Sequence, residues 1–456
     1  MGHSREAVAA ALGRALGGSV IDLQRLSGGA SRITSAFDLE AGDGSTRPMI
    51  LQEERSHGLV PGGRVSIEAR LLRAADDLDV PVPQVVAAGV EDGLDPGWMV
   101  VERIEGETIP RKLLRDPQWA TARNALTAQC GSALASIHRI DPDSIPGMPR
   151  RDPLREPLPF LDGLGEVRPC LELGVRWLEM NRPVSDRRVT VHGDFRMGNL
   201  LVGPNGLCAV LDWELAHAGD PAEDIGWLCA RSWRFGGHGR VGGFGDLPEL
   251  LDAYRSAGGE AIGSDRVRWW EVYAAVKWAV ICALQAATHL GGSTRSVELA
   301  AIGRRVCESE WDLLLLLDLA PDDAGPPTVD LTPPLAVEPF GRPSALELVE
   351  AVREHLETSA VDEPGGRATF DNRVVRNVLL MVEREIRLGQ SMVRAHADRL
   401  AGLGFNGDAE LASTIRSGSF DDSLDTVGRV LAQSVRDQLL VANPSYLESV
   451  GGEGPG

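Results

Sequence analysis

The spacing of hydrophobic residues divides the chain into three regions. The first extends to about Ile104 and contains a helical pattern over residues 66–78, with Ile67, Leu71 and Leu78 on one face. The run Val80-Pro81-Val82-Pro83 ends this helix, because proline cannot continue it. Three short apolar-rich runs around it have the pattern of strands: Ser35–Glu40, Met49–Gln52 and Trp98–Ile104. The pattern predicts a small β-rich lobe over residues 1–104.

The second region, residues 105–320, has mainly helical spacing and one interruption. Between Val189 and Trp213, the apolar run 200–202 meets the turn sequence Gly203-Pro204-Asn205-Gly206, and a second apolar run follows at 207–211. This order predicts a β-hairpin inside a larger helical lobe. The region ends in a helix through Trp311 and residues 313–317.

The third region begins after a stretch rich in proline. Residues 321–343 contain seven prolines and few apolar clusters, which is typical of a linker. Ser344 then stands where an N-cap would, with Glu347 three residues on, as in a capping box. One helix is predicted from Ala345, Leu348, Val352 and Leu356, and a second from Val375, Leu379, Val382 and Ile386. Residues 344–456 are therefore predicted to form a separate all-helical domain.

Charge and composition narrow the class of protein. The chain has 456 residues and a net charge of −20, which argues against binding to nucleic acid or to anionic membranes. The six cysteines form no CxxC pair, so a zinc site is not expected. The N-terminus has no convincing signal peptide, and the most apolar stretch, residues 274–290, is too short and too polar to span a membrane. We predict a cytoplasmic protein.

One constellation suggests chemistry. The segment His192-Gly193-Asp194-Phe195-Arg196-Met197-Gly198-Asn199 precedes the hairpin, and Asp212 stands at the end of the second apolar run. Phosphoryl transfer needs one carboxylate to accept a hydrogen bond from the attacking hydroxyl. It also needs a carboxylate and an amide oxygen to hold Mg²⁺ against the phosphates. Asp194 and Asn199 can point to one place from a tight loop, and the hairpin returns Asp212 to it.

Each of these residues alone has a simpler interpretation. A lone Asp or Asn in a glycine-containing loop is usually a turn former, and a lone His192 is more often a packed loop residue than a catalyst. The combination of HGDxxxxN, a hairpin and an apolar run that ends in Asp is much more specific. We therefore take the set as functional and assign His192 no proton transfer.

The same segment resembles the catalytic loop of the aminoglycoside phosphotransferase and choline kinase superfamily, which has a protein-kinase-like fold. The resemblance covers roughly residues 20–320. It implies an α+β, two-lobed fold followed by the separate all-α domain, with ATP and Mg²⁺ as cofactors. It also implies that Asp194 is the catalytic base and that Asn199 and Asp212 bind magnesium. The loop around them would be supported by His192, Arg196, Asp220 and Asp224.

The resemblance also implies a nucleotide site in residues 1–104. The glycine loop over the phosphates corresponds to Ser27, Gly28, Gly29 and Ser31, although as a lone motif it could equally be an ordinary turn. Glu68 corresponds to the helix residue that pairs with the phosphate-binding cation. Glu102 and Ile104 correspond to the hinge whose backbone contacts adenine.

One position departs from the family pattern. The phosphate-binding Lys or Arg should follow the strand residues 49–51, and this chain has Gln52 there. A neutral amide cannot replace a cation that holds phosphates. Three explanations stay open: Arg55 reaches in from a shifted register, another cation substitutes, with Arg32 in the glycine loop as one candidate, or the chain binds nucleotide weakly and is a poor kinase or a non-catalytic pseudokinase or scaffold.

The acceptor is a small hydroxyl compound on this resemblance. Cations and aromatics follow Asp224, and Trp227, Arg231 and Arg234 are the candidates for an acceptor site. If this stretch borders the acceptor site, it suits an anionic or acyl substrate better than a polycationic antibiotic; equally, it is a solvated loop whose aromatic residues belong to the core. The HGDFRxGN form resembles the kinase-like part of certain acyl-CoA dehydrogenase proteins, so we favour a hydroxyacyl-CoA or hydroxy acid, with an aminoglycoside as the alternative. The C-terminal region resembles a helical domain of unknown function, through which a homodimer is conceivable.

Overall fold

The computed structural model describes most of the chain and divides it into two compact units. The described residues are 4–26, 32–54, 64–89, 97–155, 157–163, 166–184, 187–320, 345–359 and 367–448. Unit 1 comprises residues 1–151 and 184–270, and unit 2 comprises residues 152–183 and 271–456. The boundary at residue 270 falls within one long helix, α9 (Ser264–Leu290).

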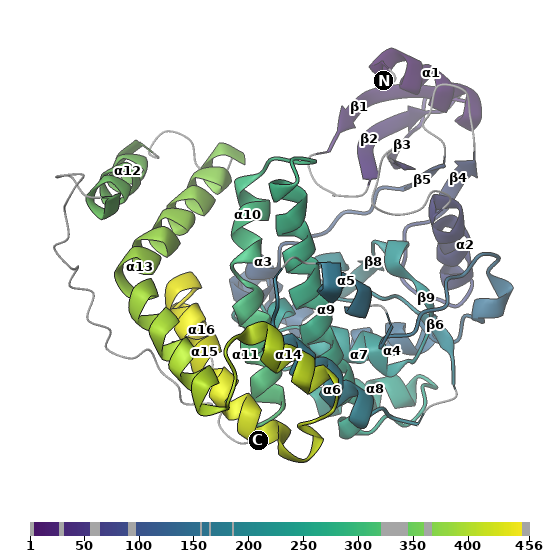
Figure 1. Cartoon of the computed structure of the whole chain (residues 1–456). Helices are drawn as coiled ribbons and strands as arrows, with labels where there is room; N and C mark the ends of the chain where they lie inside the picture. The colour runs from purple at the N-terminus through teal and green to yellow at the C-terminus, as the bar shows by residue number, and fades with distance from the viewer. Residues whose placement is uncertain are drawn as a thin grey trace. The chain divides into compact units, whose positions relative to one another are not determined.

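The first half of unit 1 is a five-stranded sheet in the order β1-β2-β3-β5-β4, in which every neighbouring pair is antiparallel (Figure 1). Its strands are β1 (Ser19–Arg25), β2 (Arg32–Glu40), β3 (Thr46–Glu54), β4 (Val85–Gly89) and β5 (Trp98–Glu102). Residues Phe37, Met49 and Leu51 alternate toward a buried cluster that Leu12 of α1 (Arg5–Leu16) completes. The apolar alternation thus fixes which face of each strand is buried.

Helix α2 (Arg64–Asp76) packs against this sheet and carries one charged residue inward. Val65, Leu71 and Leu72 are buried, as helical spacing requires. Glu68 is also buried, on the same helix. A buried carboxylate is costly unless it is paired, so its partner matters for the site.

The second half of unit 1 holds two short antiparallel sheets between helices. Strands β6 (Val189–Val191) and β9 (His217–Gly219) pair with each other, and β7 (Leu200–Gly203) pairs with β8 (Gly206–Val210). The surrounding helices are α3 (Pro110–Arg115), η1 (Pro117–Trp119), α4 (Ala120–Ile137), η2 (Pro142–Ser144), η3 (Met197–Asn199), η4 (Trp213–Leu215), α7 (Ala222–Cys229), η5 (Arg231–Trp233) and α8 (Leu247–Ser256). The predicted hairpin is therefore present as β7 and β8.

Unit 2 is helical throughout its described residues. It contains α5 (Pro157–Gly163), α6 (Pro169–Met180), most of α9, α10 (Val297–Gly303), α11 (Val306–Leu316), α12 (Ala345–Ser359), α13 (Arg367–Gly402), α14 (Asp408–Arg416), η6 (Asp421–Ser423), α15 (Leu424–Ala442) and α16 (Ser445–Glu448). Helix α15 packs on both α11 and α13, and α14 packs on α6 (Figure 1). Arg416 of α14 forms an ion pair with the buried Glu172 of α6.

These contacts explain how the units differ from the predicted domains. The proposed boundaries placed α6 and α11 with the catalytic lobe, whereas both helices group with the C-terminal helices. Buried apolar residues of α11, such as Leu313 and Leu314, need a covering partner, and α15 supplies it. The predicted linker at 321–343 and the N-cap Ser344 lie outside the described residues.

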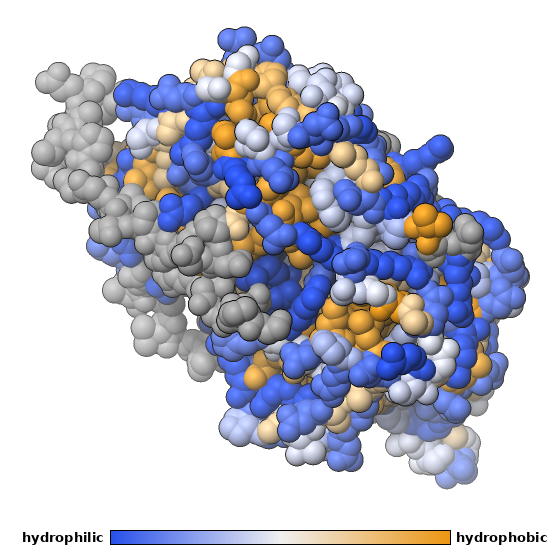
Figure 2. Space-filling view, turned by 90° about the horizontal axis from the view of Figure 1, so that it is seen from below, coloured by the Kyte–Doolittle hydropathy of each residue, from blue (hydrophilic) through white to orange (hydrophobic). Residues whose placement is uncertain are grey.

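The other predictions about the fold can be compared directly. The mixed α+β class with an all-helical C-terminal region is confirmed. Strand β5 ends at Glu102, two residues before the predicted end. Among the described helices, none has a stretch long and apolar enough to cross a lipid bilayer. One face of the molecule is largely hydrophilic, with hydrophobic residues gathered in a few patches (Figure 2).

Candidate active site

The loop between β6 and η3 holds Asp194 in a fixed orientation. Its Oδ1 accepts hydrogen bonds from Trp227 Nε1 at 2.8 Å and from Arg196 Nε at 3.0 Å. Its Oδ2 accepts from Asn199 Nδ2 at 2.6 Å. Gly193 precedes it with φ of 78°, and a Cβ there would lie 2.5 Å from the Leu215 carbonyl oxygen. Only glycine fits this turn, which explains the residue before Asp194.

The contacts of Asn199 also determine which way its amide points. Nδ2 donates both to the carboxylate and to the backbone oxygen of Asp194. The carbonyl oxygen Oδ1 must then lie on the other side of the amide group. An amide oxygen in that position is the kind of hard ligand that Mg²⁺ takes.

Asp212 is brought to the same loop by the hairpin. The amide of Leu211 donates to the Asn199 carbonyl oxygen at 2.8 Å, and Leu211 O lies 3.1 Å from His192 Nε2. Asp212 itself has φ of 64°, the left-handed conformation, which is uncommon outside glycine. Strained backbone of this kind persists where surrounding contacts hold it, and it clusters at functional sites.

The charge around Asp212 is unbalanced toward the negative. Burial and the nearby Glu214 and Glu68 together raise the pKa of Asp212 to about 7, against the opposing effect of Arg32. A buried carboxylate among other carboxylates is stabilised by a divalent cation. Asp212 and Asn199 together offer two oxygen ligands, and the set fits Mg²⁺, which usually completes its shell with waters and phosphate oxygens. No group of three or more His, Cys, Asp or Glu side chains suited to a metal occurs among the described residues.

His192 and Asp224 hold this loop through hydrogen bonds to its backbone amides. Asp194 N donates to His192 Nδ1, so that nitrogen is unprotonated and Nε2 donates to Leu211 O. Burial lowers the pKa of His192 despite the nearby Asp224 and Asp194, consistent with a neutral ring. Asp224 is fully buried and accepts from the amides of His192 and Gly193 at 2.7 and 2.8 Å.

Arg32 is the cation beside the helix residue Glu68. Its Nη1 forms an ion pair with Glu68 Oε2, and its Nε lies 3.7 Å from Glu214 Oε2. Glu68 Oε1 accepts from the amide of Trp213, directly after Asp212. Burial works against the Arg32 charge, but Glu68, Glu214 and Asp212 outweigh it and hold the pKa of Arg32 above its usual value. Arg55 lies outside the described residues.

The remaining predicted residues fall in different places. Glu102 ends β5 and pairs with Arg47 at 2.5 Å, and Ile104 follows it. Asp220 is held by Arg266 at 2.7 Å. The glycine-loop residues Ser27, Gly28, Gly29 and Ser31 lie outside the described residues.

Of the three acceptor-site candidates, one contacts Asp194 directly. Trp227 does so through its ring nitrogen, and Arg231 begins η5 a few residues further on. Arg234 is buried and donates to the Cys229 carbonyl oxygen from two of its nitrogens. We therefore assign Arg234 to the support of this segment.

Two features near Asp194 carried no signal that sequence reasoning used. Trp233 packs 5.3 Å from Trp227 between ring centroids, and the Arg196 guanidinium lies 4.8 Å from the Trp233 ring. His138 of α4 lies 3.2 Å from Asp224. A contact between residues 86 positions apart leaves no local pattern, whereas the Arg196 and Trp233 pair could have been suspected from the aromatic-rich segment.

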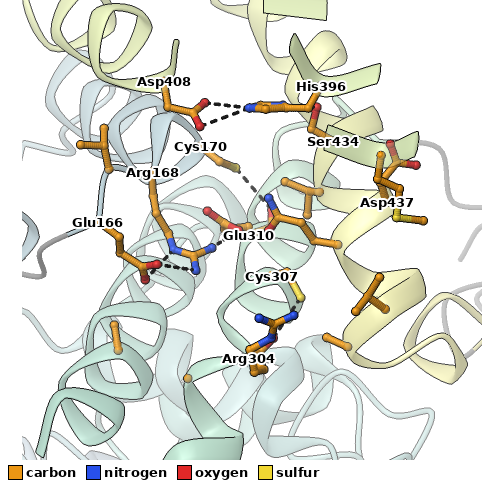
Figure 3. A pocket seen from close by; sticks show the side chains of 18 of the residues that line it. Glu166, Arg168, Cys170, Arg304, Cys307, Glu310, His396, Asp408, Ser434 and Asp437 are labelled. Atoms are coloured by element: carbon orange, nitrogen blue, oxygen red, sulfur yellow. Dashed lines mark hydrogen bonds and ion pairs between the residues drawn. The ribbon is translucent and has the colours of Figure 1, made fainter. Parts of the chain in front are cut away.

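Unit 2 contains a pocket of about 850 Å³ (Figure 3). Its polar side chains pair with one another: Arg168 with Glu310 at 3.1 Å and with Glu166 at 3.0 Å, and Arg304 with Glu385 at 2.6 Å. His396 lies between Asp408 at 3.1 Å and Ser434 at 2.9 Å. Asp437 pairs with Arg399. Every acidic residue that lines this pocket thus has a cationic partner or a His.

The sheet, the HGD loop and the hairpin together define a phosphotransferase of the kinase-like fold that acts on an alcohol group. Residues 22–270, more than half of the chain, match the model of the Phosphotransferase enzyme family, and the chain belongs to that family. Residues 350–446 match a domain of unknown function, DUF6285. The resemblance identified from the sequence is confirmed.

Curated relatives match part of the chain only. Acyl-CoA dehydrogenase family member 10 of Mus musculus is 27% identical over 204 residues, which cover 40% of this chain and 18% of that protein. Acyl-CoA dehydrogenase family member 11 of Homo sapiens is 24% identical over 189 residues, covering 39% and 24%. The matches thus span less than a quarter of these relatives.

Solved structures share the fold at low identity. A Ralstonia eutropha protein classed with the aminoglycoside phosphotransferases is 19% identical, with a TM-score of 0.56 over 69% of this chain and 98% of that chain. Spectinomycin phosphotransferase, solved with ADP and spectinomycin, is 15% identical, with a TM-score of 0.50 over 67% and 97%.

Proposed function

We propose that this chain transfers the γ-phosphoryl group of ATP to a hydroxyl group of a hydroxyacyl-CoA or hydroxy acid. The observation that carries the proposal is the convergence of three side chains. Asp194 and Asn199 are hydrogen-bonded at 2.6 Å, and the hairpin joins Leu211, next to Asp212, to Asn199 at 2.8 Å. A base and two oxygen ligands therefore meet at one loop, which is what phosphoryl transfer requires.

Asp194 acts as the base in this proposal. Trp227, Arg196 and Asn199 fix its carboxylate through hydrogen bonds. The acceptor hydroxyl donates to this carboxylate and gives up its proton to it as its oxygen bonds to the γ-phosphorus, while the bond from that phosphorus to the β,γ-bridging oxygen breaks and ADP leaves. Orientation is the main contribution of the protein here, since the reaction has little covalent chemistry for side chains to perform.

Asn199 Oδ1 and Asp212 would hold Mg²⁺. The ion supplies neutralisation of the phosphate charge that develops during transfer. The chain's own contribution is the fixed Asn199 amide and the strained Asp212 backbone, which aim both ligands before substrate arrives. The glycine-loop residues, and the backbone of Glu102 and Ile104, are proposed to hold the nucleotide.

The acceptor preference is supported by the side chains beside Asp194. The Trp227 and Trp233 rings are buried and pack against each other, and the partly exposed Arg196 guanidinium lies over Trp233 as a positive charge beside Asp194. A polycationic antibiotic would be repelled by Arg196, whereas an acyl or anionic acceptor would be attracted. The acyl-CoA dehydrogenase family relatives agree with this preference. Arg231 is the further candidate for binding the acceptor's negative charge.

The test is ADP release with a panel of hydroxyacyl-CoAs, hydroxy acids and aminoglycosides, with and without Mg²⁺. We expect turnover with an acyl or hydroxy-acid acceptor that requires Mg²⁺. Asp194→Asn should lower kcat by about 10²- to 10⁴-fold and leave the circular dichroism spectrum and unfolding midpoint close to wild type. Asp252→Asn, an exposed carboxylate on α8, is the matched control and should retain full activity.

Two results would count against the proposal. Turnover with aminoglycosides alone would replace the acceptor class. No turnover with any acceptor, in a protein that is folded and binds ATP, would favour the scaffold alternative.

A further inference from the structure

Strand β3 lacks the expected phosphate-binding cation, and the register of the sheet indicates which residue can take its place. The family resemblance expects a Lys or Arg at position 52 on β3, where this chain has Gln52. Strand β2 runs antiparallel beside β3, with Thr34 opposite Gln52 and Arg32 opposite Glu54. Arg32 and Thr34 lie two residues apart, so their side chains share a face with Gln52. A long side chain from Arg32 can therefore reach the space in front of position 52.

The contacts show that it does so. Arg32 Nη1 lies 3.4 Å from Gln52 Oε1 and forms the ion pair with Glu68 Oε2. Glu68 is the residue that the resemblance pairs with the phosphate-binding cation. The resemblance expects an ion pair between a cation on β3 and Glu68 of α2. In this chain the cation that pairs with Glu68 is Arg32 of β2.

The Arg32 guanidinium also has capacity left for a ligand. Its contacts with described residues use Nη1 and Nε, and Nη2 has no partner among them. Two carboxylates, Glu68 and Glu214, flank it, and its side chain is 8% exposed. A planar guanidinium held on two sides presents its remaining donors in a fixed direction, which suits a phosphate oxygen.

Gln52 is complementary to this arrangement. A Lys or Arg at position 52 would place a second positive charge against Arg32. The neutral amide instead offers Oε1 as an acceptor to Nη1, which helps to orient the guanidinium. The neutral Gln52 and the cation Arg32 are therefore linked: the positive charge has moved from position 52 to position 32.

We propose that Arg32 binds the non-transferred phosphates of the nucleotide and that Gln52 is a positioning residue that orients it. This inference rests on the proposed function, because it needs the chain to bind ATP. It places the phosphate-binding cation of the nucleotide site on β2 in place of β3.

The test compares nucleotides that differ in phosphate number, by calorimetry on the full chain. Arg32→Gln should weaken MgATP and MgADP by about 10- to 100-fold, the loss expected for a hydrogen bond to a charged group. It should leave the affinity for adenosine within about 2-fold, because adenosine has no phosphate. Arg25→Gln removes an exposed guanidinium from β1 of the same sheet and is the matched control, with unchanged affinities.

A transposed variant sharpens the test. Arg32→Gln with Gln52→Arg returns the cation to β3 and should recover most of the lost MgATP affinity. Gln52→Ala alone should cost less than Arg32→Gln, because the guanidinium remains. Arg32→Gln leaves the buried Glu68 carboxylate without its cation, which can destabilise the fold. The double variant Arg32→Gln with Glu68→Gln has no such unpaired charge, and it should show the same loss of MgATP and MgADP affinity.

The outcomes separate the two proposals. Wild-type MgATP binding with no loss in Arg32→Gln overturns the role of Arg32 and leaves the function intact. Equal losses for adenosine and MgATP show a structural role and also overturn it. A wild-type chain that binds no nucleotide overturns the proposed function and this inference with it.

Discussion

The candidate active site in unit 1 and the pocket in unit 2 are both rich in charged residues, yet their charges are arranged differently. In the pocket, Glu310, Glu385 and Asp408 each face an Arg or His within 3.1 Å. Around Asp212 the neighbours include further carboxylates, and its pKa is raised to about 7, first by burial. A charge left uncompensated in the protein alone indicates that a ligand supplies the compensation. The pocket's charged side chains compensate one another, so a structural role is enough to explain them.

This comparison predicts the largest loss of stability at the pocket. Arg168→Met keeps the side chain's apolar contacts but leaves the buried Glu310 without its partner. Breaking a buried pair from one side costs about 3 kcal/mol. Urea unfolding should show this loss, whereas phosphotransfer by the remaining folded protein should be unchanged.

The exposed partner supplies the control. Glu166→Gln removes the half-exposed end of the same cluster and should cost well under 1 kcal/mol. If Arg168→Met lowers turnover without lowering stability, the pocket has a function and the contrast between the two regions fails.

Asp224 extends the comparison into unit 1, because it is a buried carboxylate whose contacts are satisfied. Burial opposes its ionisation, but the hydrogen bond and charge of His138 and the contacts of His192 outweigh burial and hold the pKa of Asp224 below its usual value. Asp224→Asn puts an amide N–H against one of the two backbone donors of His192 and Gly193. We expect a loss of about 2 kcal/mol at pH 7.

The pH dependence of that loss has a definite sign. A carboxylate with a lowered folded-state pKa contributes stability above its unfolded pKa of about 4. That contribution is lost as the pH falls through the lower, folded-state pKa. The gap between wild type and Asp224→Asn in urea unfolding should stay constant from pH 7 to about pH 5 and shrink below pH 4. A gap that widens toward acid would show that ionised Asp224 destabilises the fold.

The parts of this site that the sequence predicted are the local ones. Asp194 and Asn199 are five residues apart on one loop, and the hairpin turn fixes the return of Asp212, so their convergence followed from spacing. The contact of Arg32 with Glu68 and Gln52 did not, because it depends on the register of β2 against β3. Apolar alternation tells which face is buried, but it does not tell which residue stands opposite another.

The division into two units could not be predicted from the sequence for a related reason. Helical periodicity shows that α6 and α11 have buried faces, but a buried face does not name its partner. The apolar face of α11 is covered by α15, more than a hundred residues later in the chain. Further predictions remain untested: the roles of the site residues, the homodimer through the C-terminal helices, the cytoplasmic location and the domain boundaries.

The same comparison predicts the smallest effect, with the opposite sign, at Asp212. Asp212→Asn removes one of several clustered carboxylates from the active site, and Asn tolerates the left-handed backbone that Asp212 adopts. In EDTA the variant should be more stable than wild type by about 1 kcal/mol, because a buried, poorly compensated charge is gone. With Mg²⁺ and ADP the order should reverse, since wild type gains stability from the bound ion and the variant loses a ligand. Thermal unfolding under both conditions measures the two differences, with Asp252→Asn as the exposed control that should shift neither. A variant that is less stable than wild type in EDTA would show that the Asp212 charge is compensated by the protein itself, as the pocket's charges are, and the distinction between the two regions would no longer hold.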